Sequence, residues 1–130
     1  MTETTEVFID TSKTYLQRLN SCFTDEVLEI LEILAVDLRK IWIEGKQVFI
    51  CGNGGSAANA LHLANDLHYG IGACGPELKI PGLRVEALSA NAGIITCLTN
   101  DKGYDNIYTH QLKVKAQPGD LLIALSGSGN

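Results

Sequence analysis

The sequence predicts an α/β fold in which helices cover a parallel β-sheet. Short apolar runs alternate with helical segments along the chain, and this alternation is typical of parallel sheets. Two of the runs end in loops of glycine, serine and asparagine, residues 52–56 and 126–130. The run before the second loop, residues 121–125, has no polar residue, which favours a strand that is buried on both faces.

The composition fits one globular domain and excludes several classes of protein. Of the 130 residues, 45% are hydrophobic and 19% are charged, which is enough apolar material for a core. The net charge of −5 leaves no basic surface for nucleic acid, and the longest apolar run is too short to span a membrane. The polar, acidic N-terminus lacks the features of a secretion signal, and the cysteines form no Cys-x-x-Cys pair. We therefore expect a cytoplasmic protein with reduced thiols.

Two amphipathic helices are expected at the start of the chain. Apolar residues at helical spacing predict a first helix over about residues 6–22. Thr24 can cap a second helix, and Gly45 can end it in a left-handed conformation. The second helix carries an apolar stripe wide enough to pack on more than one side, made of Val27, Leu31, Leu34, Leu38 and Ile41 with Leu28, Ile30 and Ala35 beside them.

Strands and helices alternate after this helical pair, which we assign to residues 1–45. We expect strands at 47–51, 83–88 and 121–125, helices at 57–68, 91–98 and 104–113, a loop at 69–83 and a turn at 118–120. A central strand that runs into a glycine-serine loop should lead into another helix. We therefore expect residues 46–130 to be a domain that is incomplete at its C-terminus; the alternative is a complete three-stranded domain.

The two glycine-serine loops are candidates for binding a phosphoryl group. Both follow strands at the carboxyl edge of the predicted sheet, where open α/β sheets bind ligands. Glycine lets backbone N–H groups turn toward an anion, serine adds hydroxyl donors, and the helix after Ser56 offers its positive end. In the alternative, residues 52–56 are a tight turn with Ser56 as helix cap. The candidate ligands from the loops are Gly54, Gly55, Ser56, Ser126, Ser128 and Asn130.

Other motifs leave more than one interpretation open. The sequence contains neither a Walker loop nor a dinucleotide-binding fingerprint, which disfavours nucleotide chemistry. His62 and Asp66 lie four residues apart on one helix face, so they can share a metal ion or a proton, or form a surface hydrogen bond. Asp101 is a helix cap or turn residue by its sequence context alone.

Three segments resemble the sugar isomerase (SIS) domain family, in its phosphoheptose isomerase branch: residues 51–67, 100–105 and 119–130. The resemblance implies a flavodoxin-like, three-layer parallel sheet. It also implies a homo-oligomer, a tetramer or a dimer, whose sites lie between subunits and whose interface uses residues 1–45. The implied reaction converts a ketose phosphate into an aldose phosphate, sedoheptulose 7-phosphate into a heptose 7-phosphate.

The resemblance also implies roles for individual residues. Serines at 56, 126 and 128 bind the sugar phosphate, and Asn53 contacts the substrate. His62 and Asp66 bind zinc together with ligands further along the chain, so the 130 residues alone are expected to be inactive. Asp66 takes part in proton transfer, and Asp101 belongs to the same active site.

Two departures from the isomerase pattern keep a second function open. Asp66 stands where the isomerases usually have glutamate, and residues 68–71 lack the arginine that commonly follows. A related branch of the family keeps the fold without the carboxylate and acts as an adaptor for the bacterial replication initiator. The alternatives are therefore a non-catalytic sugar-phosphate sensor or protein adaptor and, thirdly, a purely structural oligomerisation module.

Overall fold

The computed structural model describes residues 3–70 and 81–129. The chain divides into two units, Met1–Leu38 and Arg39–Asn130. No helix among the described residues is both long and apolar enough to cross a membrane. The rest of the predicted loop, residues 71–80, lies outside the described part.

The first unit holds α1 (Glu3–Ser21) and the start of α2 (Asp25–Glu44). Thr24 caps α2 as predicted, because its Oγ1 accepts a hydrogen bond from the Val27 N–H at 3.3 Å. Most of the described large apolar side chains of this unit are exposed, with Phe8 at 72% and Ile33 at 63%.

The second unit contains the sheet and its covering helices. The end of α2 lies here, and Gly45 terminates it with φ of 64°, as the sequence predicted. The elements that follow are β1 (Gln47–Gly52), α3 (Gly55–Asn65), a π-helical turn η1 (Asp66–Gly70), β2 (Arg84–Ala87), α5 (Ala92–Lys102), a 3₁₀ turn η2 (Tyr104–Asn106), α6 (Ile107–Lys115) and β3 (Leu121–Leu125).

The three described strands form a parallel sheet in the order β2-β1-β3. The predicted α/β class is confirmed, and each predicted strand lies within two residues of its observed bounds. Since β1 is central, its residues are the most buried, and Val48 and Ile50 have no exposed surface. β1 therefore fixes the position of the loop that follows it.

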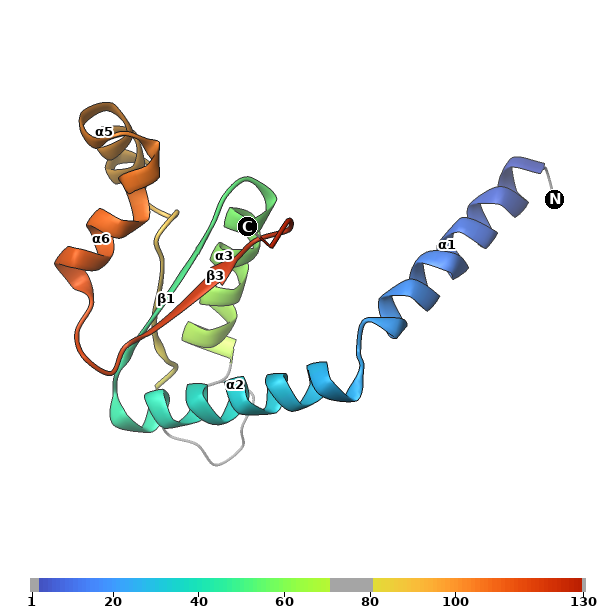
Figure 1. Cartoon of the computed structure of the whole chain (residues 1–130), viewed down its shortest axis with the longest axis horizontal. Helices are drawn as coiled ribbons and strands as arrows, with labels where there is room; N and C mark the ends of the chain where they lie inside the picture. Colours follow the sequence, from blue (N-terminus) through green and yellow to red (C-terminus); the bar gives the residue numbers. More distant parts are fainter. Residues whose placement is uncertain (1–2, 71–80, 130) are drawn as a thin grey trace. The chain divides into compact units, whose positions relative to one another are not determined.

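Helices lie on both faces of this sheet. α3 packs against all three strands, and α6 packs on the opposite face of β1 (Figure 1). On the α6 side, Tyr108 and Leu112 cover the buried pair Phe49 and Cys51. Alternate residues of β1 thus face two different helix layers, which explains why this strand is apolar from Val48 to Cys51.

The predicted burial of both faces of β3 is wrong for the described structure. Its residues alternate between half-buried and exposed, and Leu122 is 45% exposed. The reason is that β3 lies at the edge of the described sheet and α3 is the described helix that packs against it, so side chains on its other face remain open. An apolar sequence makes burial of both faces favourable, but each face is buried only where another element packs against it.

Candidate functional site

The two glycine-serine loops lie at the same edge of the sheet, as predicted. β1 and β3 are parallel neighbours, and their register pairs Gly52 with Leu125, so both loops begin at the same level. A cavity of about 390 Å³ lies between the loops. Its lining comes from both of them and from α6: Cys51, Gly52, Asn53, Ser56, Tyr108, Ala124, Leu125, Ser126, Gly127 and Ser128.

The first loop turns tightly because two glycines permit it. A Cβ on Gly52 would lie 2.8 Å from the backbone of Ser56, so no other residue fits there without a shift. Gly54 has φ of 54° and is the N-cap of α3, with no side-chain cap. Ser56 is therefore not the helix cap, and that part of the alternative is wrong. The first turn of α3 instead presents its positive end at this edge of the sheet.

The second loop brings two hydroxyl groups together. Ser126 Oγ accepts a hydrogen bond from the Gly129 N–H at 3.0 Å and lies 3.4 Å from Ser128 Oγ. These contacts hold the loop in a compact turn after β3. Asn130, the other predicted ligand of this loop, lies outside the described residues.

Tyrosine side chains support the first loop from the α6 side, and the sequence analysis did not identify them. The Tyr104 hydroxyl donates to Asn53 Oδ1 at 2.8 Å. The Tyr108 hydroxyl lies 3.0 Å from the same oxygen and bonds the Gly52 carbonyl. The available signal was their spacing of four residues, which places two phenols on one helical face.

His62 and Asp66 form a pair. They follow the cavity residue Ser56 in the chain but do not line the cavity themselves. Nε2 of His62 lies 3.5 Å from Oδ2 of Asp66, and the two side chains are 79% and 55% exposed. Donors at zinc–ligand distances of about 2.0–2.2 Å lie about 3.3–3.6 Å apart at tetrahedral angles, so this separation fits two ligands of one ion. No third His, Cys, Asp or Glu joins them within the described ranges.

Asp101 lies in the last turn of α5, and its contacts are local. One carboxylate oxygen accepts from Asn100 Nδ2 at 2.7 Å, and the other lies 3.6 Å from Cys97 Sγ. The side chain does not line the cavity between the loops. The segment that carries Asp101 reaches the cavity instead through Tyr104, which follows it by three residues and contacts Asn53.

Two ionisable groups of the cavity have raised pKa values. Burial raises the pKa of the Cys51 thiol, so this cysteine is a neutral, poorly reactive wall residue. Burial is also the largest cause of the raised pKa of Tyr108, with the neighbouring Tyr104 and Cys51 adding to it. The Tyr108 hydroxyl therefore keeps its proton at neutral pH and remains a hydrogen-bond donor.

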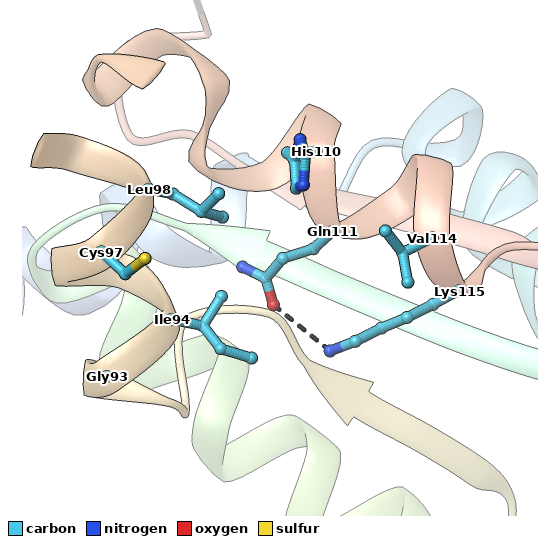
Figure 2. A pocket seen from close by; sticks show the side chains of 8 residues that line it. All are labelled: Gly93, Ile94, Cys97, Leu98, His110, Gln111, Val114 and Lys115. Atoms are coloured by element: carbon cyan, nitrogen blue, oxygen red, sulfur yellow. Dashed lines mark hydrogen bonds between the residues drawn. The ribbon is translucent and has the colours of Figure 1, made fainter. Parts of the chain in front are cut away.

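A second cavity, of about 330 Å³, lies between α5 and α6. Figure 2 shows that Ile94, Leu98 and Val114 form much of its wall, with the Gln111–Lys115 hydrogen bond at one side. Its wall is mainly apolar and contains neither of the serine loops. Its polar side chains, among them Gln111 and Lys115, stand at the border of an apolar hollow, and no glycine-serine loop faces it, so the cavity between the loops is the better candidate for a phosphoryl group.

Comparison with known proteins places the chain in a family. Residues 8–130 match the family model described as "SIS domain". The chain is 37% identical to the phosphoheptose isomerase of Rhodospirillum rubrum over 134 residues, an alignment that covers 100% of this chain and 64% of that protein. It is 38% identical to the corresponding protein of Mycobacterium tuberculosis over 126 residues, with 96% and 60% covered.

Solved structures agree with this match. A phosphoheptose isomerase from Neisseria gonorrhoeae has a TM-score of 0.72 at 25% identity, covering 99% of this chain and 63% of that one. One from Francisella tularensis shares the fold, with a TM-score of 0.74 at 20% identity and coverage of 97% and 62%. The chain thus spans about three fifths of the length of the relatives that it matches. On these matches, the chain belongs to the SIS domain family, and its curated relatives are phosphoheptose isomerases.

Proposed function

We propose that the chain is part of an isomerase that interconverts a ketose phosphate and an aldose phosphate, with sedoheptulose 7-phosphate as substrate. The observation that carries the proposal is the cavity that both serine loops share at the carboxyl edge of the sheet. The names of the curated relatives support the choice of reaction and of sugar.

The phosphate group of the sugar would bind at the two loops. The hydroxyls of Ser56, Ser126 and Ser128 are candidate donors, and the backbone of Gly54 and Gly55 stands at the positive end of α3. Donors from two separate strands can surround several oxygens of one dianion. This arrangement holds the phosphate and leaves the sugar carbons to extend toward other residues.

The reaction requires a base beside the sugar. A proton leaves the carbon next to the ketone carbonyl to give an enediolate, and a proton is returned to the former carbonyl carbon. The neighbouring hydroxyl gives up its proton, the former carbonyl oxygen gains one, and the aldose results. We propose Asp66 as the base, because its carboxylate is exposed and lies on the helix that begins at the first loop. Asp101 is the second proposed acidic residue of the site, on the segment that Tyr104 joins to Asn53.

We further propose zinc as the metal, with His62 and Asp66 as two of its ligands. The donor types and their 3.5 Å separation support this choice, and a complete site needs three or four ligands. When bound, zinc would polarise the carbonyl oxygen and stabilise the negative charge of the enediolate.

The proposal is tested by incubating the intact protein with sedoheptulose 7-phosphate and zinc in deuterated water. The aldose should form, and deuterium should appear at the carbon that exchanges its proton, as detected by NMR. An absence of both product and exchange in the zinc-loaded protein would exclude the isomerase.

A second candidate function is non-catalytic sugar-phosphate binding, as in a sensor or protein adaptor. It is favoured by the short carboxylate at position 66 and by the two-member ligand set among the described residues. In that case the sugar phosphate raises the melting temperature and is recovered unchanged. A purely structural module would show no shift with any phosphosugar.

The assembly and location are also proposals. We propose a homotetramer or dimer. Residues 1–45 would form the interface between subunits and residues 46–130 the sugar-phosphate-binding domain, because apolar side chains of the first unit are exposed. Light scattering on the intact protein tests the assembly. A cytoplasmic location is supported by the exposed free thiols of Cys22 and Cys97, which a reducing compartment preserves.

A further inference from the structure

The oxygen of the Asn53 side chain is held by two phenols that come from a different part of the chain. Tyr104 belongs to η2 and Tyr108 to α6, and their hydroxyls lie 2.8 and 3.0 Å from Asn53 Oδ1. The contacts span 51 and 55 residues of sequence. The crossover between β2 and β3 therefore holds the loop that follows β1.

We propose that Tyr104 and Tyr108 are positioning residues, which orient the Asn53 amide so that its NH₂ group donates to an oxygen of the sugar phosphate. This inference rests on the proposed function and deepens it. An asparagine side chain has one acceptor oxygen and one NH₂ donor group. Tyr104 donates its proton to this oxygen, and Tyr108, which shares its one proton with the Gly52 carbonyl, lies beside it, so the NH₂ group is left for a ligand in the cavity that Asn53 lines.

The orientation of the Asn53 amide affects the binding of an anionic ligand. A carbonyl oxygen turned toward phosphate would repel it, whereas an N–H group hydrogen-bonds to it. Asn53 is exposed, so without the phenols its amide could rotate freely between the two orientations. Fixing the amide before binding removes the free-energy cost of ordering it when the ligand arrives.

The two tyrosines contribute unequally. Tyr108 is half-buried, lines the cavity and also bonds the Gly52 carbonyl, so it is tied to the strand end itself. Tyr104 is 52% exposed and has Asn53 Oδ1 as its hydrogen-bond partner. Loss of the Tyr108 hydroxyl should therefore weaken ligand binding more than loss of the Tyr104 hydroxyl.

The test is a double-mutant cycle on the intact protein, with binding of sedoheptulose 7-phosphate measured by calorimetry. Tyr108→Phe should weaken binding about five- to tenfold and Tyr104→Phe about two- to fivefold, as expected for a lost hydrogen bond. In an Asn53→Ala background, Tyr104→Phe should have almost no further effect, because the group that it positions is gone, whereas Tyr108→Phe should keep only the part of its effect that comes from the Gly52 carbonyl. Thr109→Val, which removes an exposed hydroxyl of α6 that does not line the cavity, is the matched control and should leave binding unchanged.

The outcomes separate this inference from the proposed function. Equal effects of the tyrosine changes with and without Asn53 would show a merely structural role and overturn the inference, even if the enzyme turns over. Non-additive effects would support it, even if the wild-type protein binds the sugar phosphate without converting it. Absence of binding to the wild-type protein would overturn both. Melting curves of all variants identify any that fail to fold. Asn53→Asp keeps an acceptor for the phenols, so this variant should fold and yet bind the dianion poorly.

Discussion

The carboxylate of Asp120 accepts a hydrogen bond from the Gln47 N–H, at 2.9 Å, and so joins the turn before β3 to the first residue of β1. Its other oxygen accepts from the Gln117 N–H at 2.8 Å. One side chain thus fixes the turn and the start of the central strand. Asp120 therefore joins the beginnings of the two strands whose ends carry the serine loops, at the opposite edge of the sheet from the cavity.

Replacing Asp120 by alanine should destabilise the protein without touching the cavity. Two backbone N–H groups lose their acceptor, and a loss of about 1–2 kcal/mol in the free energy of unfolding is expected. For a protein of this size the melting temperature should fall by roughly 3–6 °C. Calorimetry checks this, and an unchanged melting temperature would show that water replaces the carboxylate without loss.

The contribution of Asp120 should also depend on pH. Hydrogen bonding from the Gln47 N–H is the largest cause that lowers the pKa of this carboxyl in the folded protein. A lowered folded pKa stabilises the protein above the unfolded value of about 3.9, and the stabilisation is lost as the pH falls through the folded pKa. The stability difference between the wild type and Asp120→Asn, measured by urea unfolding, should therefore be full at pH 6 and shrink below about pH 4.

Gly52→Ala should disturb the first loop. The new Cβ would lie 2.8 Å from the Ser56 backbone, so the start of α3 must move away from the end of β1. Sugar-phosphate affinity should fall at least tenfold, with a lower melting temperature. Gly70→Ala is the matched control for stability, because a Cβ there meets nothing within 4 Å. Equal melting temperatures for the two variants would contradict the close approach.

Removal of metal should abolish turnover if zinc is the electrophile. We expect dialysis against a chelator to stop the reaction and added zinc to restore it. His62→Ala should lower the zinc content, measured by atomic emission, and Asp66→Glu should retain it, because glutamate keeps the carboxylate. Full activity in the metal-free protein would remove zinc from the mechanism.

The described cysteines should differ sharply in reactivity. Burial raises the pKa of the Cys51 thiol, whereas Cys97 is exposed on α5. At pH 8, iodoacetamide should label Cys97 quickly and Cys51 only after unfolding, because the thiolate is the nucleophile. Peptide mapping by mass spectrometry distinguishes them, and rapid labelling of Cys51 in the folded protein would contradict its burial.

The sequence predicted best the features that depend on neighbouring residues. β3 has the predicted bounds, and the helix ends at Thr24 and Gly45 follow from local backbone chemistry. The shared edge of the two loops followed from topology, since parallel strands place their carboxyl ends together. Such signals need only a short window of sequence.

Features that depend on distant contacts escaped prediction. The sequence places Asp120 in a turn, but it gives no sign of the hydrogen bond that this residue accepts from Gln47, 73 residues earlier in the chain. The phenols of Tyr104 and Tyr108 meet Asn53 only because the chain folds back along the sheet. The helix after the first loop was expected to continue regularly to about residue 68, but it changes to a π-helical turn at Asp66. Periodicity does not reveal a single widened turn.

The outer side of β3 has a practical consequence for handling the protein. Within the described residues, that side offers a row of unsatisfied amide and carbonyl groups next to the exposed Leu122. Such a row is a template on which strands of other molecules can assemble. A recombinant product limited to these 130 residues should therefore aggregate as its concentration rises, and a lysine at position 122 would be a sensible first remedy.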